Sequence, residues 1–225
     1  MMRGIDTIRK WFEKPVRFAY IGIYLQTGTK MLDVGCGTHA PYSTFAYYSK
    51  LVYSGIDWND IEGKKDMEYF FQCDLEDNTL SEIQDNYYDV ITLSHIIEHV
   101  ANGEKLITSL ISKLKPNGVI YIETPSEKSL RLPSWYGTLN FYDDPTHKRL
   151  YMLSELKKIL EENNCVVFRL GIRRSLKRIL LSPLYILSTL MRDKRVNATA
   201  LWDITGFAHY VLAKKREPAA LFLRQ

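Results

Sequence analysis

The most constraining feature of this sequence is an apolar run that ends in two glycines one residue apart, Met31-Leu32-Asp33-Val34-Gly35-Cys36-Gly37. Leu32 and Val34 suit a strand that is buried on both faces. Glycines at the carboxyl end of such a strand let the backbone approach a ligand closely. Because glycines also end strands for purely structural reasons, the pair alone is a weak signal, and the other parts of a nucleotide-type site have to come from elsewhere in the chain.

Two further predicted strands each end in a carboxylate. Residues 51–56 form an apolar segment that leads to Asp57. About twenty residues separate Gly35 from this acid, which is the usual distance between a glycine turn and a ribose-binding carboxylate. Residues 68–73 are predicted to form a third strand, which ends at Asp74. Together with Asp33, three acidic residues therefore fall at strand ends.

The later segments alternate strands with helices. Strands are predicted over residues 88–93 and 119–123, and helices begin near residue 40 and cover 103–114 and 154–163. A closing strand pair is predicted over 165–170 and 207–213. This alternation predicts an α/β fold with a mostly parallel, doubly wound sheet, in which ligands bind at the carboxyl ends of the strands.

Length and composition favour a single domain over residues 1–225. With 46% hydrophobic residues, the chain can bury one substantial core. We divide it into a helical cap over 1–29, with helices expected over 5–26, a ligand-binding core over 30–124 and a substrate-side part over 125–225. The formal net charge of +4 is too small to indicate nucleic acid, and no DNA partner is expected.

The cysteines and the amino-terminal apolar run bear on the compartment. Cys36, Cys73 and Cys165 are an odd, widely spaced set, which argues against a disulfide framework and a cysteine zinc site and fits a reducing cytoplasm. The apolar run over 18–25 is short and is broken by Gly22, so we expect no signal peptide and no membrane span.

These residues resemble, in order and spacing, the class I methyltransferases that use S-adenosylmethionine. The matching segments are Leu-Asp-Val-Gly-Cys-Gly (32–37), Gly-Ile-Asp (55–57), Cys-Asp-Leu (73–75), Tyr-Asp-Val-Ile (88–91), Ile-Ile-Glu-His-Val (96–100) and Leu-Lys-Pro-Asn-Gly-Val-Ile (114–120). The resemblance covers roughly residues 30–170. It implies a Rossmann-like sheet of seven strands with a reversed last strand, an N-terminal helical cap and a helical insertion before the last strand.

The resemblance also implies roles for single residues. Gly35 and Gly37 lie against the amino-acid part of the cofactor, Asp33 near its ammonium, Asp57 on the ribose hydroxyls and Asp74 on the adenine amino group. The full expected cofactor set is Asp33, Gly35, Cys36, Gly37, Asp57, Trp58, Asp74, Leu75 and Ser94, with Trp58 on the adenine face. S-adenosylmethionine carries an ammonium and a sulfonium but no phosphate, so strand-end carboxylates suit it.

Other functions remain as alternatives. A dinucleotide oxidoreductase tolerates Gly35-Cys-Gly37-Thr-His-Ala40, but it does not explain Asp33 or the Leu-Lys-Pro-Asn-Gly step before residue 119. A protein that binds S-adenosylmethionine without catalysis, as a regulator or assembly partner, stays open. An RNA methyltransferase is less favoured, because aromatic residues suited to base stacking are thinly spread around the basic residues.

The acceptor chemistry is indicated by a histidine cluster. His95, Glu98 and His99 stand at i, i+3 and i+4, which places them on one face if a helix has begun there. His147 lies in a polar loop over 143–149 that is expected at the same edge of the sheet. Since a hydroxyl acceptor needs a base or a metal that lowers its pKa, Glu98, His99 and His147 are the predicted catalytic residues, with His99 or His147 as the general base.

The same four residues are the predicted metal ligands, His95, Glu98, His99 and His147. The arrangement resembles metal-dependent O-methyltransferases of the ubiquinone pathway and small-RNA 2′-O-methyltransferases, where Glu-x-x-Glu-His and a later histidine hold a divalent ion. Here His95 replaces the first acid, which favours Zn, Fe, Co or Ni over Mg. The alternative is a pocket that Glu98 and His99 line without a metal.

The substrate-side part contains a long aromatic-rich connection over 125–150 and an insertion over 171–200. In the insertion, bases flank an apolar run over 179–191 that is too short to span a bilayer. A peripheral contact of 173–195 with the inner face of a membrane, a lid and a homodimer contact all fit, and we favour the lid or dimer because apolar helical stripes are usually buried. The acceptor is predicted to be a hydroxyl of a small molecule or of a glycan, for which a lipid-linked form is considered.

Overall fold

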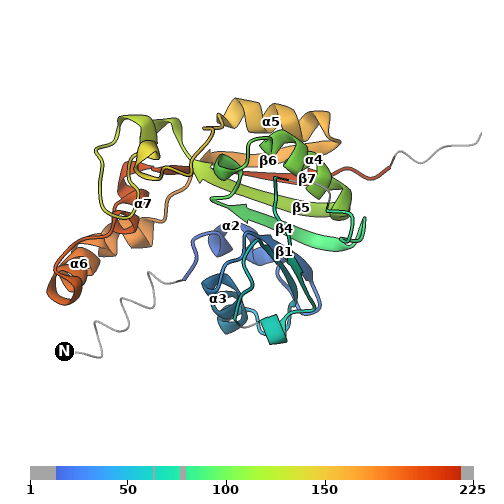
Figure 1. Cartoon of the computed structure of the whole chain (residues 1–225), viewed down its shortest axis with the longest axis horizontal. Coiled ribbons are helices and arrows are strands. Elements are labelled where there is room, and N and C mark those ends of the chain that lie inside the picture. The colour runs from blue at the N-terminus through green and yellow to red at the C-terminus, as the bar shows by residue number, and fades with distance from the viewer. Residues whose placement is uncertain (1–13, 63, 77–79, 219–225) are drawn as a thin grey trace, which may run out of the picture.

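Seven strands form one sheet in the computed structural model, which describes residues 14–62, 64–76 and 80–218 (Figure 1). The strands lie in the order β3-β2-β1-β4-β5-β7-β6. Their bounds are β1 Lys30–Val34, β2 Val52–Asp57, β3 Tyr69–Gln72, β4 Tyr88–Ser94, β5 Leu114–Pro125, β6 Cys165–Ile172 and β7 Ala208–Lys215. All pairings from β3 to β5 are parallel, whereas β7 runs antiparallel to both β5 and β6. The predicted mostly parallel sheet with a reversed last strand is confirmed.

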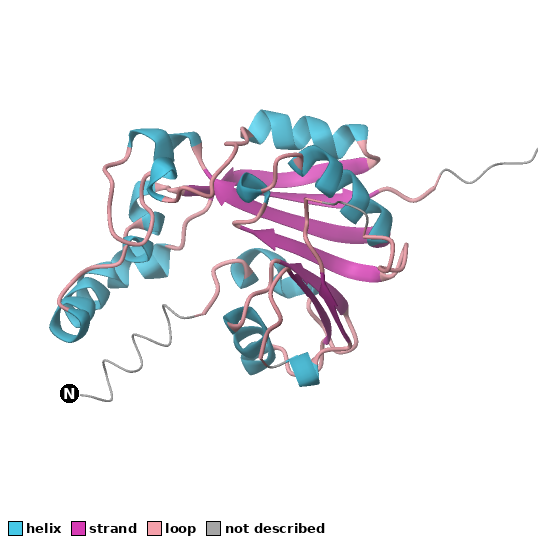
Figure 2. Ribbon diagram, in the orientation of Figure 1, coloured by secondary structure: helices cyan, strands magenta, loops and turns pink. Residues whose placement is uncertain are grey.

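Helices lie on both sides of this sheet (Figure 2). The α-helices are α2 Phe18–Ile21, α3 His39–Tyr47, α4 Gly103–Lys113, α5 Leu153–Glu162, α6 Leu176–Asp193 and α7 Trp202–Thr205. Short 3₁₀ helices are η1 Gly22–Tyr24, η2 Lys64–Asp66, η3 Ile97–His99, η4 Glu127–Arg131, η5 Phe141–Asp143 and η6 Ala198–Ala200. Of the predicted helical cap, residues 5–13 lie outside the described residues, and α2 with η1 accounts for the rest.

Two apolar clusters flank the central strands. Ile120 and Ile122 of β5 pack in the cluster that also contains Leu106 of α4, whereas Tyr121 packs in the other cluster with Tyr20 of α2. Successive side chains of a strand point to opposite faces, so a strand covered on both sides is apolar at consecutive positions. This burial explains why these central strands are near-continuous apolar runs in the sequence.

The sequence of helix α4 explains where the helix begins, which side of it is buried and where it ends. The side chain of Asn102 accepts a hydrogen bond from the Lys105 N–H at 3.0 Å, which caps the first turn. Leu106 and Leu110, one helical turn apart, are fully buried against the sheet. The helix ends at Lys113, and the chain continues directly into β5.

The insertion is helical, as predicted, but the apolar side chains of its helix α6 are partly or largely exposed. Pro183 lies inside α6, where it removes one backbone donor. The carbonyl oxygen of Ile179, which an N–H at position 183 would have bonded, instead accepts a hydrogen bond from Ser182 Oγ at 2.7 Å. The leucines of α6 are largely exposed, which differs from the expectation of a buried stripe.

Candidate functional site

The glycine turn follows β1 and lies against the segment that follows β4. Gly35 has a φ of +68° and Gly37 a φ of +53°, a region that other residues rarely adopt. A Cβ at Gly35 would lie 1.9 Å from Ile96 Cδ1. A Cβ at Gly37 would meet no atom within 4 Å. The turn is therefore closely packed at its first glycine and open at its second.

Asp57, the last residue of β2, binds this turn directly. Its Oδ2 accepts a hydrogen bond from the Gly37 N–H at 2.9 Å, and its Oδ1 accepts one from the Asn59 N–H at 3.0 Å. The Gly35 N–H donates to the Ile56 carbonyl at 2.8 Å. These bonds hold the ends of β1 and β2 together, and each carboxylate oxygen retains a lone pair for a ligand.

Asp33 differs from the expectation that it lies near the cofactor's ammonium. Its carboxylate is 1% exposed and accepts hydrogen bonds from Arg17 (3.0 and 2.7 Å), Tyr53 (2.7 Å) and Thr92 (2.8 Å). The alternation along β1 turns Asp33 toward the face covered by α2, away from the face shared by Leu32 and Val34. Asp33 is therefore the partner of a buried arginine, not an open ligand group.

The other expected cofactor residues lie at the same edge of the sheet with different exposures. Trp58 is 71% exposed, and Asp74 is exposed with its Oδ1 bonded to the Glu76 N–H at 2.9 Å. Ser94 is partly buried, and its Oγ has no hydrogen-bond partner among the described residues. Leu75 is partly buried, and Cys36 is buried. Burial, followed by the charges of nearby aspartates, raises the pKa of the Cys36 thiol to about 12, so the thiol is neutral at physiological pH.

The segment after β4 does not continue as a helix. His95 has a φ of +57°, and η3 begins only at Ile97. The His95 N–H donates to the Glu123 carbonyl at 2.8 Å, which extends the bonding between β4 and β5 by one residue. The prediction that His95 shares a helical face with Glu98 and His99 is therefore wrong.

The imidazole of His95 lies between two carboxylates. Its Nδ1 is 3.1 Å from Glu98 Oε1, and its Nε2 is 3.1 Å from Glu123 Oε1. Burial alone would lower the pKa of His95, but hydrogen bonds to Glu123 and Glu98 outweigh it and raise the pKa to about 9. A ring that is protonated at neutral pH and has both nitrogens engaged does not suit a metal ligand. The predicted ligand role of His95 is thus not supported by its surroundings.

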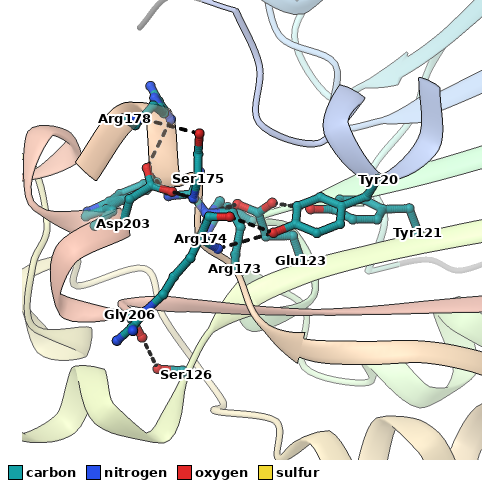
Figure 3. Close-up of polar contacts among 12 residues, drawn as sticks. Tyr20, Tyr121, Glu123, Ser126, Arg173, Arg174, Ser175, Arg178, Asp203 and Gly206 are labelled. Carbon is teal, nitrogen blue, oxygen red and sulfur yellow. Dashed lines mark hydrogen bonds and ion pairs between the residues drawn. The ribbon is translucent and has the colours of Figure 1, made fainter. Parts of the chain in front are cut away.

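Glu123, which contacts His95, also belongs to a buried ion cluster at the start of α6. Figure 3 shows Glu123 with Arg173, Arg178 and Asp203 of this cluster. Arg173 Nε lies 3.3 Å from Glu123 Oε1, and its Nη2 lies 3.6 Å from Asp203 Oδ2. Arg178 Nη1 lies 3.4 Å from the same oxygen of Asp203. Burial alone would raise the pKa of Glu123, but Arg173 and His95 lower it to about 2. The carboxylate is therefore ionised throughout the neutral range.

Reasoning from the sequence overlooked Glu123 and Asp203, and it counted Arg173 among the bases that flank the apolar run, whereas Arg173 is only 4% exposed. Glu123 ends the predicted strand over 119–123, so the rule that selected Asp57 and Asp74 would also have selected it. Asp203 carries no comparable local signal, since only the fold brings its carboxylate within 3.6 Å of the Arg173 guanidinium.

The structure brings Glu98, His99 and His147 together. One ligand atom from each lies within 4.8 Å of the others, and the two imidazole centroids are 4.8 Å apart. Glu98 is fully buried, and its Oε2 accepts a hydrogen bond from Thr124 at 3.0 Å. The Lys148 N–H donates to the Glu98 carbonyl at 2.7 Å, which fastens the loop over 143–149 to η3.

The tautomers of both histidines follow from their partners. Thr146 Oγ1 lies 2.6 Å from Asp144 Oδ1, which can only accept, so the hydroxyl proton points there. The same oxygen therefore accepts from His99 Nδ1–H at 2.8 Å. His147 Nδ1 donates to the Phe141 carbonyl at 2.6 Å. In the neutral state, both Nε2 atoms thus carry a lone pair.

Asp144 supports this orientation electrostatically. Burial alone would raise its pKa, but hydrogen bonds from the Thr146 hydroxyl and N–H, with His147 and His99 nearby, bring the pKa below its usual value. An ionised carboxylate at one end of the chain Asp144–Thr146–His99 stabilises an imidazolium at the other end. The arrangement is suited to taking a proton at His99 Nε2.

A cavity of about 260 Å³ opens where β5 and β6 end and α5 begins. Its lining residues are Ser126, Glu127, Lys128, Leu153, Ser154, Ile172 and His209. Burial lowers the pKa of His209 to about 4, so this ring is neutral at physiological pH. Its Nε2 has no hydrogen-bond partner within the described part of the chain, which leaves it for a polar group of a ligand.

A family model described as a methyltransferase domain matches residues 5–170. The ubiquinone biosynthesis O-methyltransferase of Pasteurella multocida is 31% identical over 128 residues, which cover 49% of this chain and 52% of that protein. The chain spans about half the length of the curated relatives it matches.

Solved structures are similar over most of the chain. A SAM dependent methyltransferase from Archaeoglobus fulgidus is 22% identical with a TM-score of 0.58, covering 92% of this chain and 94% of that one. The Haemonchus contortus phosphoethanolamine N-methyltransferase 2 in complex with S-adenosyl-L-methionine is 17% identical with a TM-score of 0.61, covering 89% of this chain and 52% of that one. At these identities the likeness concerns the fold.

Proposed function

This chain belongs to the methyltransferase domain family, and from that premise we propose that it transfers a methyl group from S-adenosylmethionine to a hydroxyl oxygen of a small molecule or glycan. The observation that carries the oxygen acceptor is the His99 imidazole, whose Nε2 lone pair is set by Thr146 and Asp144. The similarity to ubiquinone biosynthesis O-methyltransferases supports the same kind of acceptor atom.

The cofactor fits the edge where β1, β2 and β4 end. Gly37 borders open space, and Ser94 Oγ is a buried polar atom without a partner among the described residues. We assign the ribose hydroxyls to Asp57, the adenine amino group to Asp74 and the adenine face to Trp58, with the amino-acid part along the glycine turn. Strand-end carboxylates suit a cofactor that is cationic and carries no phosphate.

The task of the chain in this reaction is alignment and proton removal. The cofactor supplies a methyl carbon already activated by its sulfonium, so the acceptor oxygen has to be held in line with that carbon. An alcohol hydroxyl is a poor nucleophile at neutral pH until a base takes its proton. His99 Nε2 takes this proton, and Asp144 stabilises the resulting imidazolium through Thr146.

A divalent cation is the second candidate for activating the hydroxyl, and a specific observation favours it. Glu98, His99 and His147 each offer a ligand atom within 4.8 Å of the others. Thr146 and Phe141 hold the Nδ1 atoms of the two rings, as the outer nitrogens of ligating histidines are usually held. Two imidazoles and one carboxylate suit Zn, Fe, Co or Ni better than Mg, and such an ion lowers the pKa of a bound hydroxyl.

Metal analysis separates these two ways of activation. The purified protein is analysed for bound metal and assayed with and without excess chelator. Full activity without metal leaves His99 as the base. Loss of activity in chelator that one cation restores, together with loss of that cation in a His147→Ala variant, supports the metal site.

The function itself is tested with labelled cofactor and a panel of acceptors that carry hydroxyl, amine or carbon nucleophiles. Calorimetry first measures whether S-adenosylmethionine binds, and mass spectrometry then locates the transferred methyl group. Transfer to oxygen is the expected result. Transfer only to nitrogen or carbon contradicts the oxygen assignment, and binding without turnover on any acceptor favours a non-catalytic binding protein.

A further inference from the structure

The face of α6 turned to solvent is apolar. Leu180 is 78% exposed and Leu187 is 55% exposed. The full set of exposed apolar side chains, named here the α6 apolar face, is Leu176, Leu180, Leu184, Leu187, Leu190 and Met191. Because residues three and four positions apart share one side of a helix, these side chains form a continuous stripe along its length.

The opposite side of α6 carries the two most buried of its described side chains, and both are polar. Ser182 is 3% exposed and Thr189 is 4% exposed, and their hydroxyls donate to carbonyls of their own helix at 2.7 and 2.8 Å. The helix lies at one end of the molecule, away from the sheet, and contacts α7 and η6 (Figure 1). The most exposed side chains of α6 are therefore apolar, unlike those of a helix packed on a core.

Exposed positive side chains lie near both ends of α6. Arg174 and Lys177 are exposed at the start of α6, and Lys194 and Arg195 are exposed at its end. The first turn of the helix contains no acidic residue. The helix therefore carries an exposed apolar stripe, with exposed bases near each of its ends.

We propose that the α6 apolar face lies in the interface of an anionic lipid bilayer. Apolar side chains of such a helix enter the boundary of the acyl chains while flanking bases meet the negative headgroups. A second copy of this chain is a poorer occupant, because parallel or antiparallel pairing of two α6 helices would bring bases beside bases. No described helix is long and apolar enough to cross a bilayer, so the contact is peripheral.

The membrane contact would also orient the candidate site. The Ser175 N–H donates to Asp203 Oδ1 at 2.7 Å, and Arg173 links Asp203 to Glu123 beside His95 (Figure 3). These contacts fasten the first turn of α6 to the edge of the sheet that carries the site. A hydroxyl acceptor embedded in the bilayer would then face this edge. The lipid contact itself does not depend on the proposed methyl transfer.

Vesicle co-sedimentation of the full chain tests the proposal. We expect binding to vesicles of mixed phosphatidylcholine and phosphatidylglycerol, weaker binding in high salt and little binding to phosphatidylcholine alone. Leu180→Glu combined with Leu184→Glu should weaken binding at least about tenfold. Arg174→Gln and Arg195→Gln should each weaken it about fivefold.

The matched control is Ile23→Glu. Ile23 of η1 is 75% exposed and lies outside α6. Replacing this apolar side chain by a negatively charged one should therefore leave vesicle binding unchanged. Circular dichroism confirms that each variant is folded, which exposed positions should allow.

Three results would overturn the proposal. The first is a wild-type chain that does not bind anionic vesicles, and the second is a pair of leucine substitutions that leaves vesicle binding as tight as in the wild type. The third is a dimer in light scattering that the leucine substitutions dissociate, without vesicle binding by either form, which would assign the face to a second copy of the chain.

Discussion

His95 Nε2 and Glu123 Oε1 lie 3.1 Å apart at the ends of the neighbouring parallel strands β4 and β5. The pair links two parts of the molecule, since Glu98 contacts the other ring nitrogen of His95 and Arg173 Nε lies 3.3 Å from the same oxygen of Glu123. Buried charges of this kind are costly to leave unpaired. The pair therefore couples the stability of the sheet edge to the charge state of the candidate site.

We expect stability to depend on pH through this pair. The folded pKa of His95, about 9, lies above its ordinary value of 6.5, so its contribution is complete below pH 6.5 and is lost as pH rises through 9. The folded pKa of Glu123, about 2, lies below 4.5, so its contribution is complete above pH 4.5 and is lost as pH falls through 2. Melting temperatures measured between pH 2 and pH 9 check both the loss of stability at high pH and the loss at low pH. In His95→Asn, whose side chain tolerates a positive φ, the loss between pH 6.5 and 9 should largely disappear. An unchanged slope would contradict the assignment.

The two glycines of the turn should respond differently to substitution. Both have a positive φ, so Gly37→Ala should cost about 1 kcal/mol of unfolding free energy from backbone strain alone. Gly35→Ala adds a clash with Ile96, so its cost should be greater by roughly 1–3 kcal/mol. Urea unfolding of the two variants measures the difference. Equal costs would mean that the contact between the turn and the segment after β4 is not tight.

Arg17→Met should act on stability, not on cofactor binding. The substitution leaves the Asp33 carboxylate buried without its charged partner, which should cost about 3–5 kcal/mol of unfolding free energy. The folded fraction should bind S-adenosylmethionine almost as tightly as the wild type.

Asp57→Asn is the counterpart of that variant. The asparagine can still accept the Gly37 N–H, but it lacks the charge assigned to the cofactor, so affinity should fall about tenfold with a smaller loss of stability. Calorimetry and urea unfolding of both variants check the pair. If Arg17→Met keeps its stability but loses affinity for the cofactor, Asp33 contributes to cofactor binding instead.

Thr146→Val should lower the rate of methyl transfer while leaving stability nearly unchanged. Thr146 is exposed, but its hydroxyl is the bridge between Asp144 and His99, and its removal frees the imidazole to rotate or change tautomer. We expect kcat to fall about tenfold or more and the pH profile of kcat to shift. Thr146→Ser, which keeps the hydroxyl, should restore most of the rate. If Thr146→Val turns over normally, His99 is not held in this way.

The sequence alone determined the strands, the order of strands and helices along the chain and the glycine turn. It did so because the apolar runs of 30–34, 88–93 and 119–123 and the helical periodicity of 103–114 are local properties that packing on both faces of a sheet preserves. The prediction that residues 1–225 form a single domain and the roles assigned to the cofactor residues stay predictions. For the carboxylates of Asp57 and Asp74, position at a strand end was a sufficient guide to the edge of the sheet on which they lie.

Only the tertiary structure decided which acidic side chains are accessible to a ligand and which are buried in ion pairs within the protein. Asp33 and Asp57 look alike in sequence, but the alternation of β1 and the arrival of Arg17 from a preceding segment bury the first. The left-handed backbone of His95 is set by its bond to β5, against the helical spacing that linked it to His99. Likewise, the exposure of the α6 leucines depends on which side of the helix meets α7 and η6. Each of these outcomes rests on contacts between segments far apart in the chain, which local pattern cannot encode.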